Sequence, residues 1–308
     1  MQPDGETRHG GPALSGRDVA QARYTIAREG NCMADYAHAI NQHYGQAELC
    51  AKILAALRVA GKDLDALTRD DLASFDEQPD GGREGTRELA RLAGLRAGMH
   101  VLDIGSGLGG PARTLAAEYG CQVTGIDLTE ESCQAAEMLT TRVGLSERVT
   151  FRQGDALHLP FDPGSFDVVW TQYALMNIAD KTRLVQEARR VLRPEGYLVF
   201  GAIMAGPVPA IHFPVFWAND PTLNFLAAPA AFRHLVIATG FTERAWEDVT
   251  AWALALGRRR QAATQGERPP LGLHVVIAGD VPQMVANVLR NFEEGRTVAV
   301  RAVYQRMA

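Results

Sequence analysis

The chain has 308 residues, of which 46% are hydrophobic and 22% are charged, and its formal net charge at pH 7 is −5. This composition is typical of a globular protein with one large domain and an appendage, or with two small domains. The negative net charge argues against a nucleic-acid-binding protein that depends on a broad basic face.

The four cysteines stand at positions 32, 50, 121 and 133 and form neither a CxxC pattern nor a Cys/His cluster. We therefore expect no metal site and no disulfide framework. The N-terminal segment lacks the apolar core of a signal peptide, and no run of 18 apolar residues is long enough to span a membrane. Together with the free thiols, these features predict a cytoplasmic protein.

The first 90 residues differ in pattern from the rest of the chain. Residues 1–16 are rich in glycine, proline and charge, which predicts a disordered tail. Residues 17–90 are predicted to form an N-terminal helical cap, because apolar residues recur at helical spacing and Pro79-Asp80-Gly81-Gly82 separates two further helices as a turn. Residues 91–308 are predicted to form the main domain.

From residue 99 onward, strands alternate with helices. The predicted strands are "MHVLDI" (99–104), "QVTGIDL" (122–128), "VTFRQGDA" (149–156), "FDVVWTQYAL" (166–175) and "YLVFGAIM" (197–204). Helical segments such as "GGPARTLAAEYG" and "DKTRLVQEARRVL" lie between them. The alternation predicts an α/β fold with a parallel sheet covered by helices on both faces, and ligands bind such sheets at the carboxyl ends of the strands.

The regular alternation stops after residue 204. Residues 205–230 contain five prolines and clustered aromatic residues, which predicts an ordered lid or insertion over the site. A helix ending at Gly240, a strand near 244–250, a long helical stretch, a helix over 281–294 and a last strand over 297–307 are expected to follow.

A glycine-rich loop follows the first predicted strand. The spacing Gly105-x-Gly107-x-x-Gly110 matches the dinucleotide fingerprint, but Asp103 would repel a pyrophosphate and favour an ammonium group. Asp127 ends the second strand at a spacing that suits a ribose, and Asp155 ends the third. Three acids at successive strand ends fit adenosine with an amino-acid tail better than a nicotinamide dinucleotide, so an NAD(P)-dependent oxidoreductase is kept only as an alternative.

Four segments occur in an order and spacing that resemble a known family. They are "VLDIGSGLGGPARTLA", "VTGIDLTEESCQAA", "VTFRQGDALHLPFDPGSFDVVW" and "RRVLRPEGYLVF". They resemble the successive motifs of class I S-adenosylmethionine-dependent methyltransferases. "GSGLGGPA", "MNIADK" and "HFPVFWA" are similar to small-molecule methyltransferases of the sarcosine/dimethylglycine, tocopherol and ubiquinone-biosynthesis type. The resemblance implies a Rossmann-like seven-stranded sheet whose last strand is antiparallel, with S-adenosyl-L-methionine as cofactor.

The resemblance also implies roles for individual residues. The methionine part of the cofactor would contact Asp103, Gly105, Ser106, Gly107 and Gly109. The adenosine part would contact Asp127, Leu128, Asp155 and Ala156, and Thr171 and Gln172 would lie beside the sulfonium. The expected acceptor-binding residues are Glu77, Gln78, Met176, Asn177, His212, Phe213, Phe216, Trp217 and His274, with Gln172, Asn177 and His212 as candidate catalytic residues.

The type of acceptor depends on whether a general base is present. A base is needed only if the accepting atom carries a proton, and Met176 and Asn177 follow the fourth strand where many relatives carry a histidine. We therefore expect transfer to the sulfur or nitrogen of a small amino-acid-like molecule. A phenol or quinol acceptor with His212 or His274 as base is the alternative. No nucleic acid or membrane is expected as a partner, and a homodimer is left open.

Overall fold

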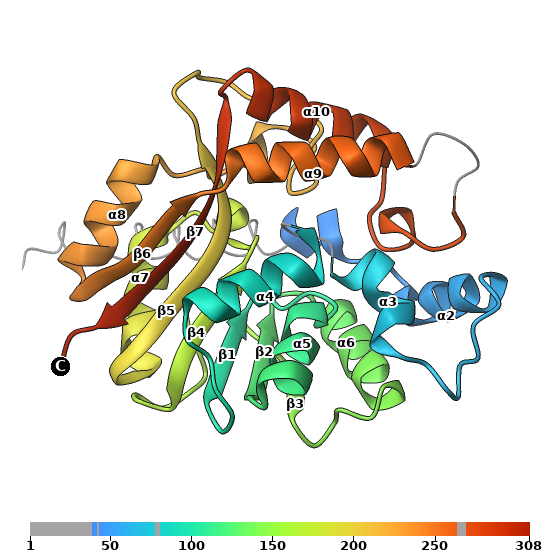
Figure 1. The fold of residues 1–308 in the computed structure, drawn as a ribbon, viewed down its shortest axis with the longest axis horizontal. Helices are drawn as coiled ribbons and strands as arrows, with labels where there is room; N and C mark the ends of the chain where they lie inside the picture. Colours follow the sequence, from blue (N-terminus) through green and yellow to red (C-terminus); the bar gives the residue numbers. More distant parts are fainter. Residues whose placement is uncertain (1–38, 42, 78–80, 264–268) are drawn as a thin grey trace, which may run out of the picture. The chain divides into compact units, whose positions relative to one another are not determined.

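A computed structural model describes residues 39–41, 43–77, 81–263 and 269–308. Within these ranges, residues 40–308 form one compact unit, with helices on both faces of a single large sheet (Figure 1). The predicted tail over residues 1–16 and the helical pattern expected up to residue 38 lie outside the described residues.

The sheet has seven strands in the described part of the chain. They are β1 (His100–Ile104), β2 (Gln122–Asp127), β3 (Val149–Gln153), β4 (Phe166–Gln172), β5 (Leu192–Ala205), β6 (Phe241–Asp248) and β7 (Thr297–Arg306). Their order is β3-β2-β1-β4-β5-β7-β6, and β7 runs antiparallel to both of its neighbours. The predicted α/β fold with an antiparallel last strand is confirmed. The strand order reverses between β1 and β4, where open α/β sheets hold their ligands.

Helices cover both faces of this sheet. They are α2 (Leu49–Val59), α3 (Arg69–Asp76), α4 (Arg83–Leu92), α5 (Gly110–Tyr119), α6 (Glu130–Arg142), α7 (Lys181–Val191), α8 (Pro229–Ala238), α9 (Thr250–Ala263) and α10 (Val281–Glu293). The buried apolar residues of α4, α5 and α6 pack against one face, whereas α7 and α8 pack against the other. The apolar side chains of α2 and α3 form a second cluster on the outer side of α6.

Side-chain alternation along β4 assigns residues to these two faces. Val168 and Trp170 lie in the core beneath α4 and α5, and Val169 and Thr171 face α7 and α8. Asp103 is paired with Trp170 across the sheet, so its side chain lies on the α4 and α5 face. Gln172 belongs to the same face, because it is two residues beyond Trp170.

Local sequence signals account for several helix ends. Thr68 and Asp71 form a reciprocal capping box at the start of α3. Helix α5 has Pro111 in its first turn and ends at Gly120, whose φ is 70°. Asp180 begins α7 by accepting a hydrogen bond from the backbone N–H of Arg183, at 2.8 Å.

Several boundaries differ from those expected, including the end of β3, which falls at Gln153 rather than at residue 156. Strand β4 ends at Gln172 rather than at residue 175, because Tyr173 adopts a φ of 63° and the chain then enters the 3-10 helix η2 (Leu175–Asn177). Strand β5 begins at Leu192 rather than at residue 197, because Leu192 already pairs with Phe166. The predicted domain boundary after residue 90 falls inside α4, whose Ala90 is fully buried in the core of the sheet.

Irregular backbone connects β5 to α8, where a lid or insertion was expected. Residues 206–228, here called the insertion, contain the short helix η3 (Pro221–Leu223) and a single bridge between Val215 and Ala218. Among the helices within the described residues, none combines the length and the apolar character needed to cross a bilayer.

Candidate functional site

The glycine loop leaves the carboxyl end of β1 and turns into α5. Gly105, Gly107 and Gly109 all have positive φ angles, of 72°, 50° and 78°. The N–H of Gly105 donates to the carbonyl of Ile126 at 2.8 Å, which ties the loop to β2. A side chain at Gly105 would place its Cβ 2.3 Å from the Cβ of Ala174, so the loop fits against the segment after β4 only without one.

Acidic side chains lie near the carboxyl ends of the three adjacent strands β1, β2 and β3. Asp103 is 2% exposed, and burial together with the charge of Asp127 raises its pKa to about 7. Asp127 accepts hydrogen bonds from the N–H of Gly107 at 2.9 Å and from the hydroxyl of Thr129 at 2.8 Å. Asp155 accepts from the N–H of Leu157 at 2.8 Å. Of the three acids, Asp127 is bonded directly to the glycine loop, through the N–H of Gly107.

Several buried polar atoms near this loop have no hydrogen-bond partner among the described residues. They include Asp103 Oδ2, Ser106 Oγ and Gln172 Nε2, and also Asp76 Oδ1 and Trp170 Nε1. The other amide atom of Gln172, Oε1, accepts from the hydroxyl of Thr86 at 3.2 Å, which fixes its orientation. Buried polar atoms in native structures are nearly always satisfied, so these atoms leave hydrogen-bonding capacity for a polar ligand.

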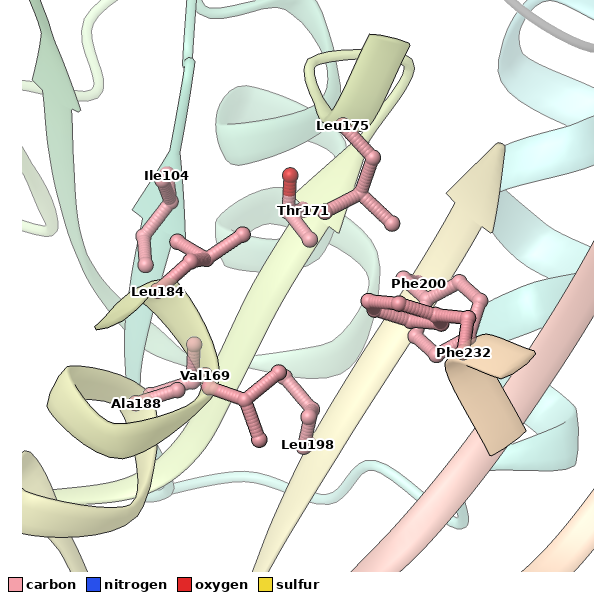
Figure 2. A pocket seen from close by; sticks show the side chains of 10 residues that line it. Ile104, Val169, Thr171, Leu175, Leu184, Ala188, Leu198, Phe200 and Phe232 are labelled. Carbon is pink, nitrogen blue, oxygen red and sulfur yellow. The ribbon is translucent and has the colours of Figure 1, made fainter. Parts of the chain in front are cut away.

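Thr171 belongs to a different environment from Gln172. Its side chain lies in a small apolar pocket between the sheet and helices α7 and α8 (Figure 2). The pocket is lined by Ile104, Val169, Thr171, Leu175, Leu184, Val185, Ala188, Leu198, Phe200 and Phe232. The sequence resemblance predicted that Thr171 and Gln172 both lie beside the cofactor's sulfonium. Strand alternation, however, points their side chains to opposite faces of the sheet.

Asn177 joins three separate segments of the chain. Its Nδ2 donates to the carbonyl of Trp217 at 2.7 Å and to that of Leu223 at 3.1 Å, both in the insertion. Its Oδ1 accepts from the hydroxyl of Tyr44 at 2.8 Å. The side chain is 7% exposed. These contacts show that Asn177 holds the insertion in place, and the catalytic role expected for it stays a prediction.

Lys181 makes a second attachment between the insertion and the segment after β4. Its Nζ donates to the carbonyls of Leu175 at 2.7 Å and Phe225 at 2.9 Å, and also to that of Ile178. Burial lowers the pKa of its ammonium group to about 8. The insertion is thus fastened to the loop after β4 by two side chains.

Comparison with known proteins identifies a family for the central part of the chain. A family model described as a methyltransferase domain matches residues 102–200. Residues 102–200 are a methyltransferase domain. The matched range starts in β1, includes the glycine loop and ends in β5, so it contains Asp103, Ser106 and Gln172.

The relatives of this methyltransferase domain act on different atoms, according to their names. The chain is 41% identical over 128 residues to 27-O-demethylrifamycin SV methyltransferase of Amycolatopsis mediterranei, a match that covers 41% of this chain and 47% of the relative. It is 31% identical over 184 residues to sarcosine/dimethylglycine N-methyltransferase of Halorhodospira halochloris, a match that covers 58% of this chain and 65% of the relative. The matches thus span about half to two thirds of these relatives.

A solved structure supports the same fold for the methyltransferase domain. Geranyl diphosphate C-methyltransferase from Streptomyces coelicolor A3(2) superimposes with a TM-score of 0.63 at 17% identity, and the match covers 88% of this chain and 98% of that one. The resemblance read from the sequence motifs is confirmed for the domain and for its fold.

The two histidines proposed as bases occupy different parts of the structure. The Nε2 of His212 lies 2.9 Å from Glu294 Oε2 on the loop after α10, and His212, with Arg296 and Arg290, lowers the pKa of Glu294 to about 2. His274 belongs to the 3-10 helix η4 (Leu273–Val275), which packs on α2 and α3. The structure does not bring these histidines together.

The aromatic and acidic residues expected at the acceptor also divide into two groups. Met176 and Trp217 are almost fully buried, whereas Phe213 and Phe216 are half-buried. Glu77 is 2% exposed, and its carboxylate accepts from Arg83 Nε at 3.0 Å and from the hydroxyl of Thr114 at 2.9 Å. Gln78 lies outside the described residues.

His43 beside the methyltransferase domain was missed by the sequence interpretation. Its Nε2 lies 3.2 Å from the carbonyl of Phe216, and its Nδ1 lies 3.4 Å from the amide of Asn219. Burial lowers its pKa, and a carbonyl can only accept, so the hydrogen-bond pattern assigns a neutral ring protonated at Nε2. The adjacent Tyr44, bonded to Asn177, was missed too. The only available signal was the His-Tyr pair at the end of a helical pattern.

Proposed function

We propose that the protein is an S-adenosylmethionine-dependent methyltransferase that methylates the nitrogen or sulfur of a small amino-acid-like molecule. The observation that carries the cofactor assignment is the set of buried polar atoms without partners: Asp103 Oδ2, Ser106 Oγ and Gln172 Nε2. They border the glycine loop at the point where the strand order reverses. A carboxylate, a hydroxyl and an amide N–H suit the ammonium and carboxylate groups of an amino-acid tail.

The remaining cofactor contacts are assigned from the resemblance to class I methyltransferases. Asp103 would receive the ammonium group, while the backbone of Gly105, Ser106, Gly107 and Gly109 would pass close to the methionine part. Leu128, Asp155 and Ala156 would contact the adenine, and Gln172 would lie nearest the sulfonium. Thr171 is the least well placed of the predicted contacts, because its side chain faces the apolar pocket.

The ribose would bind to Asp127. An ionised carboxylate has about four acceptor positions. Three hydrogen bonds already reach Asp127, from the N–H of Gly107 and from the N–H and hydroxyl of Thr129. Two ribose hydroxyls would therefore take the remaining position and displace the Thr129 hydroxyl.

S-adenosylmethionine, when bound, supplies a methyl group that is already activated as a sulfonium. The chain's own contribution is then mainly to position the acceptor and exclude water, effects worth about 7–11 kcal/mol at most. Phe213 and Phe216 would give the acceptor an aromatic surface, which also stabilises a cationic product. Asn177 and Lys181 would hold the insertion that carries both rings.

Transfer without a general base is proposed because Met176 and Asn177, rather than a histidine, follow β4. An amine or thioether is already a nucleophile when it carries no proton at the reacting atom. The alternative is a phenol or quinol acceptor with His212 or His274 as base. Glu294, 2.9 Å from Nε2 of His212, would orient that ring for such a role.

Labelled methyl transfer tests the proposed function. The protein is incubated with S-adenosylmethionine carrying a deuterated methyl group and a metabolite pool of amines, thioethers and phenols, and products are sought by mass spectrometry. We expect a labelled amine or sulfonium product. A labelled phenol ether would favour the alternative acceptor. Binding of NADH and of S-adenosylhomocysteine is measured separately by quenching of tryptophan fluorescence. Binding of NADH alone would contradict the proposal and favour an oxidoreductase.

The ionisation of Asp103 predicts how cofactor affinity depends on pH. The pKa of this carboxyl is about 7 in the folded protein, so below pH 7 it is mostly neutral and cannot pair with an ammonium group. We expect the affinity for S-adenosylhomocysteine to rise about 25-fold at most between pH 5.5 and 7.5, since the ligand's α-ammonium, with a pKa of about 8, stays mostly charged over this range.

Calorimetry with the wild type and Asp103→Asn checks this dependence. The variant keeps the shape of the side chain but cannot ionise, so its affinity should be lower than that of the wild type at pH 7.5 and nearly constant with pH. An equally steep rise in the variant would show that another group controls the titration.

A further inference from the structure

Two consecutive buried acids at the end of α3 are bonded to two consecutive residues of α5. Asp76 pairs with Arg113, and Glu77 accepts a hydrogen bond from Thr114. None of the four side chains is more than 8% exposed. Helix α5 starts directly after the glycine loop, so these contacts join α3 to the element that supports the loop.

Arg113 lies directly behind the glycine loop. Its Nη2 donates to Asp76 Oδ2 at 2.5 Å, and its Nη1 donates to the hydroxyl of Thr140 in α6 at 3.0 Å. A Cβ on Gly109 would be 3.0 Å from the same Nη1, so the guanidinium is in contact with the loop backbone. Arg113 therefore connects α3, α6 and the loop at one point.

The backbones of α3 and α5 also approach closely. A Cβ on Gly110 would lie 2.2 Å from the carbonyl oxygen of Asp76, a distance that no side chain could tolerate. Glu77 is held from its other side by Arg83, the first residue of α4. Glu77 is thus held by both α5 and α4.

Such an arrangement is not explained by stability alone. Burial raises the pKa of Asp76 in spite of the neighbouring Arg113, and it raises that of Glu77 as well. The cost of removing paired charges from water often equals or exceeds their attraction, and an apolar pair of similar volume would do as well. Charged groups with fixed directions do, however, define the position of the helices that they join.

We propose that Asp76 and Arg113 are positioning residues that hold the glycine loop in the conformation that binds the cofactor. The inference rests on the proposed function, because it concerns the same loop. Removing the pair would let α5 and the loop shift relative to β1 and α3. Cofactor affinity would then fall although neither side chain touches the cofactor.

The test measures S-adenosylhomocysteine binding by calorimetry in Asp76→Asn, Arg113→Met and Gly110→Ala. The first two remove one charge of the pair, and the third separates the helices without changing any charge. We expect affinity to fall about 5- to 30-fold in each variant. Arg113→Lys keeps the positive charge and should recover part of the loss. Arg233→Met removes an exposed ion pair with Glu243 and serves as the control with unchanged affinity.

Hydrogen exchange of residues 105–110 provides the second measurement. Faster exchange in this loop, with unchanged exchange in β5 and β7, supports the proposal. If Arg113→Met or Gly110→Ala does not fold, Asp76→Asn decides the outcome. Affinity within twofold of the wild type in folded Asp76→Asn would overturn the inference. Absence of binding by the wild type itself would overturn the proposed function, and this inference with it.

Discussion

Replacing Asp127 by alanine is expected to weaken S-adenosylmethionine binding by about 2–4 kcal/mol, which corresponds to roughly 30- to 900-fold in affinity. Two effects contribute to this loss. The variant removes a charged acceptor for the ribose hydroxyls. It also removes the acceptor for the N–H of Gly107, so the glycine loop loses one of its attachments. Isothermal titration calorimetry measures the affinity directly.

Two further variants separate the effects at this residue. Asp127→Asn can still accept from the N–H of Gly107 but carries no charge, so it should recover part of the affinity through the loop. Thr129→Val removes the hydroxyl that donates to Asp127 and should change affinity by less than about 1 kcal/mol. Cofactor affinity within twofold of the wild type in Asp127→Ala would remove Asp127 from the site.

Replacing Asn177 by leucine is expected to lower the free energy of unfolding by about 2–5 kcal/mol. The leucine is close to asparagine in shape, but it leaves the buried carbonyls of Trp217 and Leu223 without their amide donor. Because the insertion depends on these bonds, limited proteolysis should cut residues 206–228 faster than in the wild type. Urea unfolding measures the stability, and the cleavage sites follow from mass spectrometry.

The matched control for Asn177 is Tyr44→Phe. It removes a single hydrogen bond to the same amide and should cost about 0.5–1.5 kcal/mol. S-adenosylhomocysteine binding should remain within about threefold in both variants, because the glycine loop makes none of these contacts. A stability of Asn177→Leu equal to that of the wild type would mean that the insertion is held mainly by other contacts.

The sequence predicts the sheet well because its signals are local. Pro111 and Gly120 mark the ends of α5, and alternation of apolar strands with helices indicates a parallel sheet. The end of β4 was misplaced, since the backbone of Tyr173 turns to a positive φ inside a continuous apolar run. No residue type in that run announces such a turn, which depends on contact with the glycine loop.

In the candidate site, too, local sequence signals could be used for prediction, whereas contacts between distant segments could not. The positions of Asp103, Asp127 and Asp155 near the carboxyl ends of β1, β2 and β3 could be predicted, because the carboxyl ends of adjacent parallel strands meet. The structural roles of Asn177 and Lys181 could not, since Asn177 bonds to carbonyls 40 and 46 residues away and Lys181 to one 44 residues away. The pairing of Asp76 with Arg113 is equally remote, at a separation of 37 residues.

The half-buried amine of Lys181 is a native site at which chemical labelling can report movement of the insertion. The sequence contains three lysines, at positions 52, 62 and 181, and Lys52 is exposed on α2. An amine-reactive ester will modify Lys52 continuously, whereas it reaches Lys181 only when the insertion separates from the loop after β4. The rate at Lys181 relative to Lys52, corrected for the larger free-amine fraction that the lowered pKa of Lys181 gives, therefore follows how often the insertion opens. The measurement uses the native chain without any engineered residue.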